Sequence, residues 1–192
     1  DEASLPKIES RIGTPLSPYA VTKRISEMYS TVFSSLYGME LIGLRYFNIF
    51  GPRQDPEGMY AAVIPKFTSM ILNQEIPQIH GDGEQTRDFT YISNAVNANI
   101  NALFTENEGA FGEVFNIACG DRISINRLYE LIMKIISNDH PEISDIGPVH
   151  VESRAGDVKH SLADIKMAVD LLDYSPEVGV EDGLISTVRS FY

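Results

Sequence analysis

Cysteine is almost absent from the sequence, and basic residues are scarce. The single cysteine, Cys119, can form no internal disulfide and has no second thiol for a metal site, which is typical of a reducing compartment. The four histidines are scattered without metal-ligand spacing, so we expect no metal site. With 15 basic against 27 acidic residues, and a net charge of −12, the chain lacks the basic face that binds nucleic-acid backbones. We therefore expect no nucleic-acid partner, although a few positioned arginines can still bind a smaller anion.

Long hydrophobic runs are also missing. No apolar run is long enough to span a bilayer, and residues 1–4 lack the basic start and apolar stretch of a signal peptide. These absences predict a cytoplasmic protein with no membrane partner. A length of 192 residues with 43% hydrophobic residues is sufficient for one sizeable domain with a core.

The stretch 17–23, with the sequence SPYAVTK, combines a phenol and an ammonium group at helical spacing. If it is helical, Tyr19 and Lys23 lie four residues apart on one face. The ammonium group would stabilise the phenolate relative to the neutral phenol, which favours a role as a base. An ordinary exposed pair on an amphipathic helix gives the same spacing, so the motif depends on its context.

The order of apolar segments and turn residues predicts an α/β chain. Ser17 is the expected N-cap of the first helix, with Pro18 at its first position and Gly38 as its C-cap, and its apolar period predicts one broad buried face. Residues 41–47 read as a buried strand of a parallel sheet. We expect the helices at 17–37, 61–73, 94–105 (capped by Ser93), 125–137 (capped by Ser124), 164–172 and 181–192. We expect the strands or extended segments at 41–47, 76–80, 87–91, 113–118 and 149–151.

The start of this chain lacks sequence features that a nucleotide-binding sheet needs. The glycine-rich turn GxGxxG does not occur, and the chain does not begin with methionine. We therefore expect the 192 residues to be the carboxyl-terminal part of a longer protein whose amino-terminal sheet lies upstream of Asp1. The alternative is a complete small domain in which the Tyr–Lys pair is accidental.

Four segments in order resemble those of the extended short-chain dehydrogenase/reductases. They are 17–23 (SPYAVTK), 45–54 (RYFNIFGPRQ), 81–89 (GDGEQTRDF) and 154–161 (RAGDVKHS). More narrowly, they resemble the nucleotide-sugar 4-epimerases that act on UDP-N-acetylglucosamine. The resemblance implies the C-terminal remnant of a Rossmann-type doubly wound parallel sheet, at 1–52, plus a smaller mixed α/β region that binds the nucleotide sugar, at 53–192. It also implies that the chain re-enters the sheet near 89–118.

The resemblance implies a catalytic role for Tyr19 and Lys23 with NAD as cofactor. Tyr19 would be the base and acid for the sugar 4-hydroxyl, and Lys23 would hold the nicotinamide ribose. Tyr46, Phe47 and Ile49 would line the nicotinamide side. Helix 17–37 would lie in the interface of a homodimer. The family's catalytic Ser or Thr and its cofactor turn would fall before Asp1, so we expect the chain to be inactive alone.

The remaining residues implied by the resemblance bind the UDP-sugar. Asn48 would bond to the diphosphate or sugar, Arg87 and Arg154 would clamp the diphosphate, and Asp157 would accept from ribose hydroxyls. The pocket walls and the uridine contacts would be formed by Ala62, Val63, Phe67, Gln78, Ile79 and His80. These residues also have explanations without a ligand. The apolar residues could belong to the core, His80 could be a surface histidine, and the arginines could form surface salt bridges to Asp88 or Asp157.

Alternative functions remain open from the sequence. UDP-glucose 4-epimerase, glucuronate epimerase, dehydratase and decarboxylase activities share the fold, and a non-enzymatic binding module is a further class. The choice between a 2-acetamido and a 2-hydroxy sugar depends on the volume of the pocket. A product for polysaccharide synthesis is the expectation for the leading function.

Overall fold

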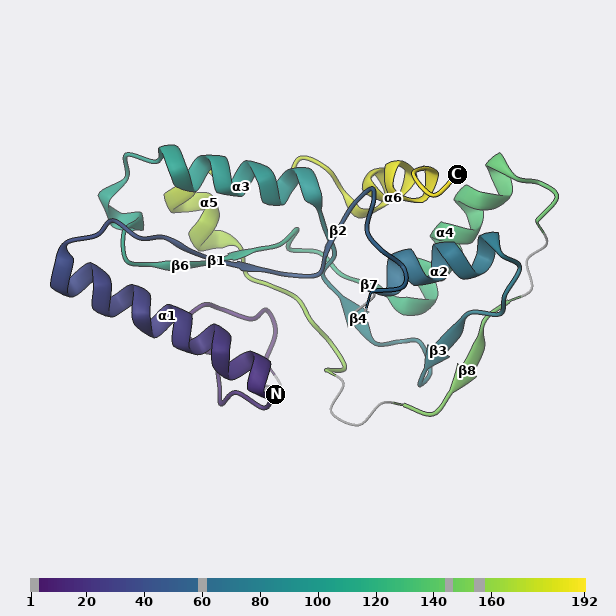
Figure 1. Cartoon of the computed structure of the whole chain (residues 1–192), viewed down its shortest axis with the longest axis horizontal. Helices are drawn as coiled ribbons and strands as arrows, with labels where there is room; N and C mark the ends of the chain where they lie inside the picture. The colour runs from purple at the N-terminus through teal and green to yellow at the C-terminus, as the bar shows by residue number, and fades with distance from the viewer. Residues whose placement is uncertain (1–3, 59–61, 144–146, 154–157) are drawn as a thin grey trace.

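The computed structural model describes residues 4–58, 62–143, 147–153 and 158–192. Within these ranges the chain forms helices on both sides of short paired strands (Figure 1). The helices are α1 (Pro18–Tyr37), α2 (Val63–Leu72), α3 (Ile92–Phe104), η1 (Glu108–Ala110), α4 (Ile125–Asp139), α5 (Lys166–Leu172) and α6 (Val180–Arg189). The strands are β1 (Gly43–Tyr46), β2 (Ile49–Phe50), β3 (Gln78–His80), β4 (Thr86–Arg87), β5 (Thr90–Tyr91), β6 (Val114–Ile117), β7 (Ile123–Ser124) and β8 (Val149–Val151). The predicted α/β class is confirmed.

The strands pair mainly in parallel. β1 pairs with β6, β2 with β5 and β3 with β8 in parallel, whereas β4 and β7 are antiparallel. In the first pair Gly43 is opposite Val114 and Tyr46 is opposite Ile117. A segment more than sixty residues downstream therefore lies beside β1, as parallel pairing through a crossover requires. The domain division at residue 52 stays a prediction.

Two hydrophobic cores stabilise the chain. One core surrounds β1 and β6, where Phe115 and Ile117 pack with Ala98 of α3 and Leu172 of α5. The other is built by α2, α4 and α6 around Ile132 and other large apolar side chains. Figure 1 shows α3 and α5 on one side of the β1–β6 pair and α1 on the opposite side. The expected place for a functional site is therefore at the ends of the strands that lie between these two cores.

Helix α1 begins and ends where its sequence predicts. The Ser17 side chain accepts from the backbone N–H of Ala20 at 3.1 Å, Pro18 opens the helix, and Gly38 closes it with a φ of 63°. The prediction of a broad buried face is wrong, because no residue of α1 is buried. A cavity of about 770 Å³ is lined by residues of both α1 and β1, and the apolar side chains of the helix stay accessible.

The predicted start of α3 is also wrong. The helix begins at Ile92 with Tyr91 as its N-cap, and Ser93 lies inside the first turn with its buried hydroxyl unpartnered. Strand β5 runs directly into the helix, so the start is set by the strand and not by a side-chain cap. In contrast, Ser124 caps α4 as predicted, accepting from the backbone N–H of Arg127 at 3.2 Å. The segment 87–91 forms parts of two separate strands, β4 and β5.

The turn before β4 requires glycine at position 83. Gly83 has a φ of +76°, and a Cβ there would collide with the Asn126 side chain, which donates to the carbonyl of Asp82 and to Glu84. We expect Gly83→Ala to lower the free energy of unfolding by about 3 kcal/mol, combining left-handed strain with overpacking. Urea denaturation measures this loss.

Gly112 provides the matched control for this substitution. Its φ of +85° is similar, but a Cβ there would have no heavy atom within 4 Å. We expect Gly112→Ala to cost only the backbone strain, about 1 kcal/mol. Equal losses for the two variants would show that Asn126 moves aside without cost.

Candidate active site and nucleotide pocket

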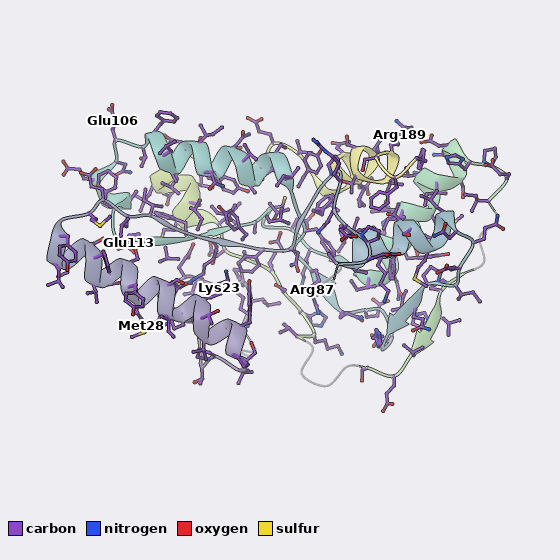
Figure 2. The ribbon with its side chains drawn as sticks, in the orientation of Figure 1. Lys23, Met28, Arg87, Glu106, Glu113 and Arg189 are labelled. Carbon is purple, nitrogen blue, oxygen red and sulfur yellow. The ribbon has the colours of Figure 1, made fainter. Side chains whose placement is uncertain are left out.

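Two cavities collect most of the predicted site residues. The first, called the helix cavity here, lies between α1 and β1 and is lined by Tyr19, Lys23 and Tyr46, among others. The second, called the central pocket here, has a volume of about 300 Å³ and lies beside α2, β3 and β4. Its lining includes the predicted residues Asn48, Ile49, Ala62, Val63, Phe67, Gln78, Ile79, His80 and Arg87. The side chains around both cavities are drawn in Figure 2, where Lys23 and Arg87 are labelled.

The Tyr–Lys pair has the geometry that its spacing predicts. The Lys23 ammonium lies over the Tyr19 ring, 5.2 Å from the ring centroid, and Tyr19 is 70% exposed. A cation over the ring face is attracted to the π-electrons. The phenol and the ammonium group therefore lie together at the surface of the helix cavity.

The base of the helix cavity is fixed by an ion pair. Arg45 of β1 donates from Nε to Glu27 of α1 at 2.6 Å and from Nη2 to the other oxygen at 3.0 Å. The guanidinium group holds the pKa of the Glu27 carboxyl below its usual value. Glu27 lies one helical turn beyond Lys23, so this bidentate bond sets the height of α1 over β1.

Residues at the end of β1 and just after it contribute to both cavity linings. Tyr46 lines the helix cavity and Asn48 lines the central pocket, and the two Cα steps between them span at most about 7 Å. Asn48 has a φ of 27°, a left-handed conformation that asparagine tolerates, and its side chain donates to the carbonyl of Asp88 at 2.9 Å. The Tyr46 hydroxyl donates to Asn99 of α3 at 2.9 Å.

The central pocket is apolar on one side and polar on the other. Phe67 and Ile79 are nearly fully buried and contribute apolar lining, and their roles toward a base stay predictions. On the polar side, His80 Nδ1 bonds to the backbone carbonyl of Glu152 at 3.0 Å, and Arg87 donates to the carbonyl of Thr86 at 3.0 Å. The pocket therefore combines a flat apolar surface with a guanidinium group.

Several residues that line the central pocket were not predicted from the sequence. They are Phe50, Ile64, Lys66, Gln85, Phe89 and Ile125. Lys66 adds a second cation to the pocket in a chain with few cations. The sequence signal that could have indicated Lys66 is its position next to the predicted wall residue Phe67. Gln85 donates from its side chain to the carbonyl of His80 at 2.7 Å and so braces the polar wall.

Three predicted site residues are not placed in either cavity. Arg154 and Asp157 lie outside the described residues. Phe47 is absent from the described linings of both cavities, and its backbone N–H instead donates to the carbonyl of Ile117 at 3.0 Å. Its backbone continues the β1–β6 pairing by one residue, and its place beside the nicotinamide stays a prediction.

The described residues contain neither a metal-binding cluster nor a membrane-spanning helix. Within the described ranges no cluster of three or more histidine, cysteine, aspartate or glutamate side chains could hold a metal ion. Of the helices that the structure describes, none is both long and apolar enough to cross a membrane.

The chain is similar to known nucleotide-sugar enzymes over nearly its whole length. A putative UDP-glucose 4-epimerase of Methanocaldococcus jannaschii is 38% identical over 185 residues, covering 96% of this chain and 56% of that protein. The solved UDP-N-acetylglucosamine 4-epimerase of Methanobrevibacter ruminantium, in complex with UDP-N-acetylmuramic acid, is 43% identical with a TM-score of 0.89. That match covers 99% of this chain and 58% of the solved chain.

A third relative carries both cofactor and substrate. The UDP-glucuronic acid 4-epimerase of Bacillus cereus, solved with UDP-glucuronic acid and NAD, is 32% identical with a TM-score of 0.84, covering all of this chain and 59% of that one. The chain thus spans about half the length of the relatives it matches. The model of the NAD dependent epimerase/dehydratase family matches residues 2–118. The chain therefore belongs to the NAD dependent epimerase/dehydratase family.

Proposed function

We propose that the full-length protein is an NAD-dependent UDP-sugar 4-epimerase, an isomerase, with UDP-N-acetylglucosamine as its substrate. The observation that carries the proposal is that Tyr46 lines the helix cavity while Asn48, two positions further along the chain, lines the central pocket. A proton-transfer pair lies in the helix cavity, and a cationic pocket with an apolar wall lies in the other. A nucleotide sugar has these two ends, since its sugar is joined to the nucleoside through a diphosphate.

The residues of this chain fit one part of the cofactor. Lys23 and Tyr19 present an ammonium group and a phenol at the cavity surface, which are suitable donors for ribose hydroxyls. NAD, when bound, supplies reversible hydride-accepting chemistry for the sugar carbon. No residue described in this chain is assigned to the adenine end of the cofactor.

The chain's own groups would do the proton transfer and the positioning. Tyr19 takes the proton of the sugar 4-hydroxyl when C4 is oxidised to the ketone, and returns it when the ketone is reduced on its other face. Lys23 stabilises the phenolate form between these two events. Arg87 and Asn48 hold the diphosphate, while the wall of Phe67 and Ile79 accommodates the base.

The choice of sugar is supported by the most similar of the relatives reported above. At 43% identity, the Methanobrevibacter enzyme acts on UDP-N-acetylglucosamine, whereas the relatives named for UDP-glucose and UDP-glucuronate are 38% and 32% identical. We extend the proposal to a homodimer that supplies a sugar nucleotide for polysaccharide synthesis in the cytoplasm.

An activity assay tests this function. Full-length protein is incubated with UDP-N-acetylglucosamine and NAD, and the products are separated by chromatography. We expect UDP-N-acetylgalactosamine, and its absence would contradict the proposal. UDP-glucose and UDP-glucuronate in parallel reactions test the two alternative epimerases. Formation of a 4-keto-6-deoxy or decarboxylated product would instead indicate the dehydratase or decarboxylase chemistry of other relatives.

A further inference from the structure

A buried carboxylate next to the central pocket takes part in no step described above. Asp88 follows Arg87 directly and has none of its surface exposed. Its two oxygens accept from the backbone N–H groups of Cys119 at 3.0 Å, Gly120 at 3.2 Å and Ala163 at 3.2 Å. One side chain therefore joins three segments, the end of β4, the loop after β6 and the segment before α5.

Such a carboxylate is costly for the fold. Burial raises the pKa of Asp88 to about 6, and the three backbone N–H bonds offset this only in part. An apolar residue would avoid that cost but could not accept from the three backbone N–H groups, so the role of this carboxylate depends on its hydrogen bonds.

The backbone of Asp88 also holds a pocket residue. Its carbonyl accepts from the Asn48 side chain at 2.9 Å, and the N–H of Thr90 donates to the Asn48 carbonyl at 3.2 Å. Asn48 adopts a left-handed φ of 27°, a conformation that persists only where its surroundings enforce it. The peptide units between Arg87 and Thr90 thus fix Asn48, and the Asp88 carboxylate fixes those peptide units.

We infer that Asp88 is a positioning residue for the diphosphate end of the central pocket. Its carboxylate locks the link between β4 and β5, so that Arg87 and Asn48 are already oriented when a ligand arrives. The inference rests on the proposed function only for the identity of that ligand, a UDP-sugar. It assigns to Asp88 no contact with the ligand.

The test compares two ligands on one variant. In Asp88→Asn one acceptor oxygen becomes an N–H donor that faces backbone N–H groups, while the shape is kept. We expect the Kd of UDP-N-acetylglucosamine at pH 7.5, measured by calorimetry, to rise at least tenfold. The Kd of uridine, measured by NMR titration, should change less than twofold, because the base lies at the other end of the pocket. Asp121→Asn makes the same charge change at an exposed neighbour and should leave both constants unchanged.

Each outcome has a distinct meaning. If the unmodified full-length protein binds no UDP-sugar, the proposed function fails. If the unmodified full-length protein binds but its Asp88→Asn variant binds equally well, the inference about Asp88 is overturned. Equal weakening of uridine and UDP-sugar also overturns it, since that pattern indicates only a structural role.

A pH series provides a second measurement if Asp88→Asn does not fold. The titratable groups around Asp88 are Cys119, Asp121 and Tyr174. UDP-N-acetylglucosamine is chosen because each of its two phosphates is substituted twice, as an ester and as the anhydride, and so lacks the second proton of a phosphate monoester, which titrates near pH 6. The series is run on His80→Gln, so that the imidazole on the polar side of the pocket takes no part.

We expect the Kd to rise several-fold between pH 7.5 and pH 5. Protonation of Asp88 places an O–H donor against backbone N–H donors and releases the link that orients Arg87. A Kd that stays constant or falls over this range would overturn the inference.

Discussion

Replacing Tyr19 with phenylalanine is expected to lower the kcat of the full-length protein in the proposed epimerisation by about 10²–10⁴-fold, the usual contribution of a general acid–base group. The substitution removes only the phenolic oxygen, so the proton of the sugar 4-hydroxyl loses its acceptor. Because Tyr19 is 70% exposed in this chain and packs mainly against Lys23, its hydroxyl contributes nothing to the cores. Steady-state kinetics with UDP-N-acetylglucosamine measures the loss.

A second tyrosine on the same helix provides the control. Tyr29 also lines the helix cavity and is 62% exposed, but it lies ten residues further along α1 and contacts Phe33. We expect Tyr29→Phe to keep kcat within about twofold and both variants to melt at the same temperature. Equal activity of Tyr19→Phe and the unmodified enzyme would remove Tyr19 from the mechanism.

The ends of helices were predictable where local chemistry sets them. Ser17, Gly38 and Ser124 act through groups within four residues of themselves, so their roles can be read from neighbouring sequence. The start of α3 was not predictable in this way. There β5 leads into the helix, and Ser93 looked like a cap only because its tertiary surroundings were unknown.

Burial was less predictable than secondary structure. The apolar period of α1 predicts a buried face, but a period does not say what covers that face. In this chain a cavity separates α1 from β1, and Val32, Phe33 and Leu36 remain exposed. The chain spans about half the length of its relatives. The periodicity of α1 carries no information about which segment would cover the helix face.

The candidate site was predicted from residue types together with the family resemblance. The structure places Tyr19 and Lys23 in the lining of the helix cavity and Arg87 in that of the central pocket. Asp88 could not be found by the same reasoning. Its partners at 119, 120 and 163 are backbone N–H groups, which any sequence supplies, and only the fold brings them to one carboxylate.

The second large effect is expected at the diphosphate. Arg87→Ala should raise the Kd of UDP-N-acetylglucosamine by about 10–100-fold, because a hydrogen bond to a charged group contributes about 1.5–3 kcal/mol. Arg87 lines the central pocket and already donates to the carbonyls of Thr86 and Lys159, which hold its guanidinium group in place. Little rotamer entropy is then lost when the ligand binds.

The control variant Arg122→Ala distinguishes a direct bond between Arg87 and the diphosphate from the overall electrostatic field of the protein. Arg122 is exposed and comes after β6, so its removal makes the same charge change away from the pocket lining. In a chain with a net charge of −12, any lost cation slows the approach of an anion, and salt screens that effect. We expect Arg122→Ala to change Kd less than twofold, and the Arg87→Ala loss to persist at high salt. If the two variants weaken binding equally, and salt abolishes both losses, then Arg87 acts through long-range charge and does not contact the diphosphate.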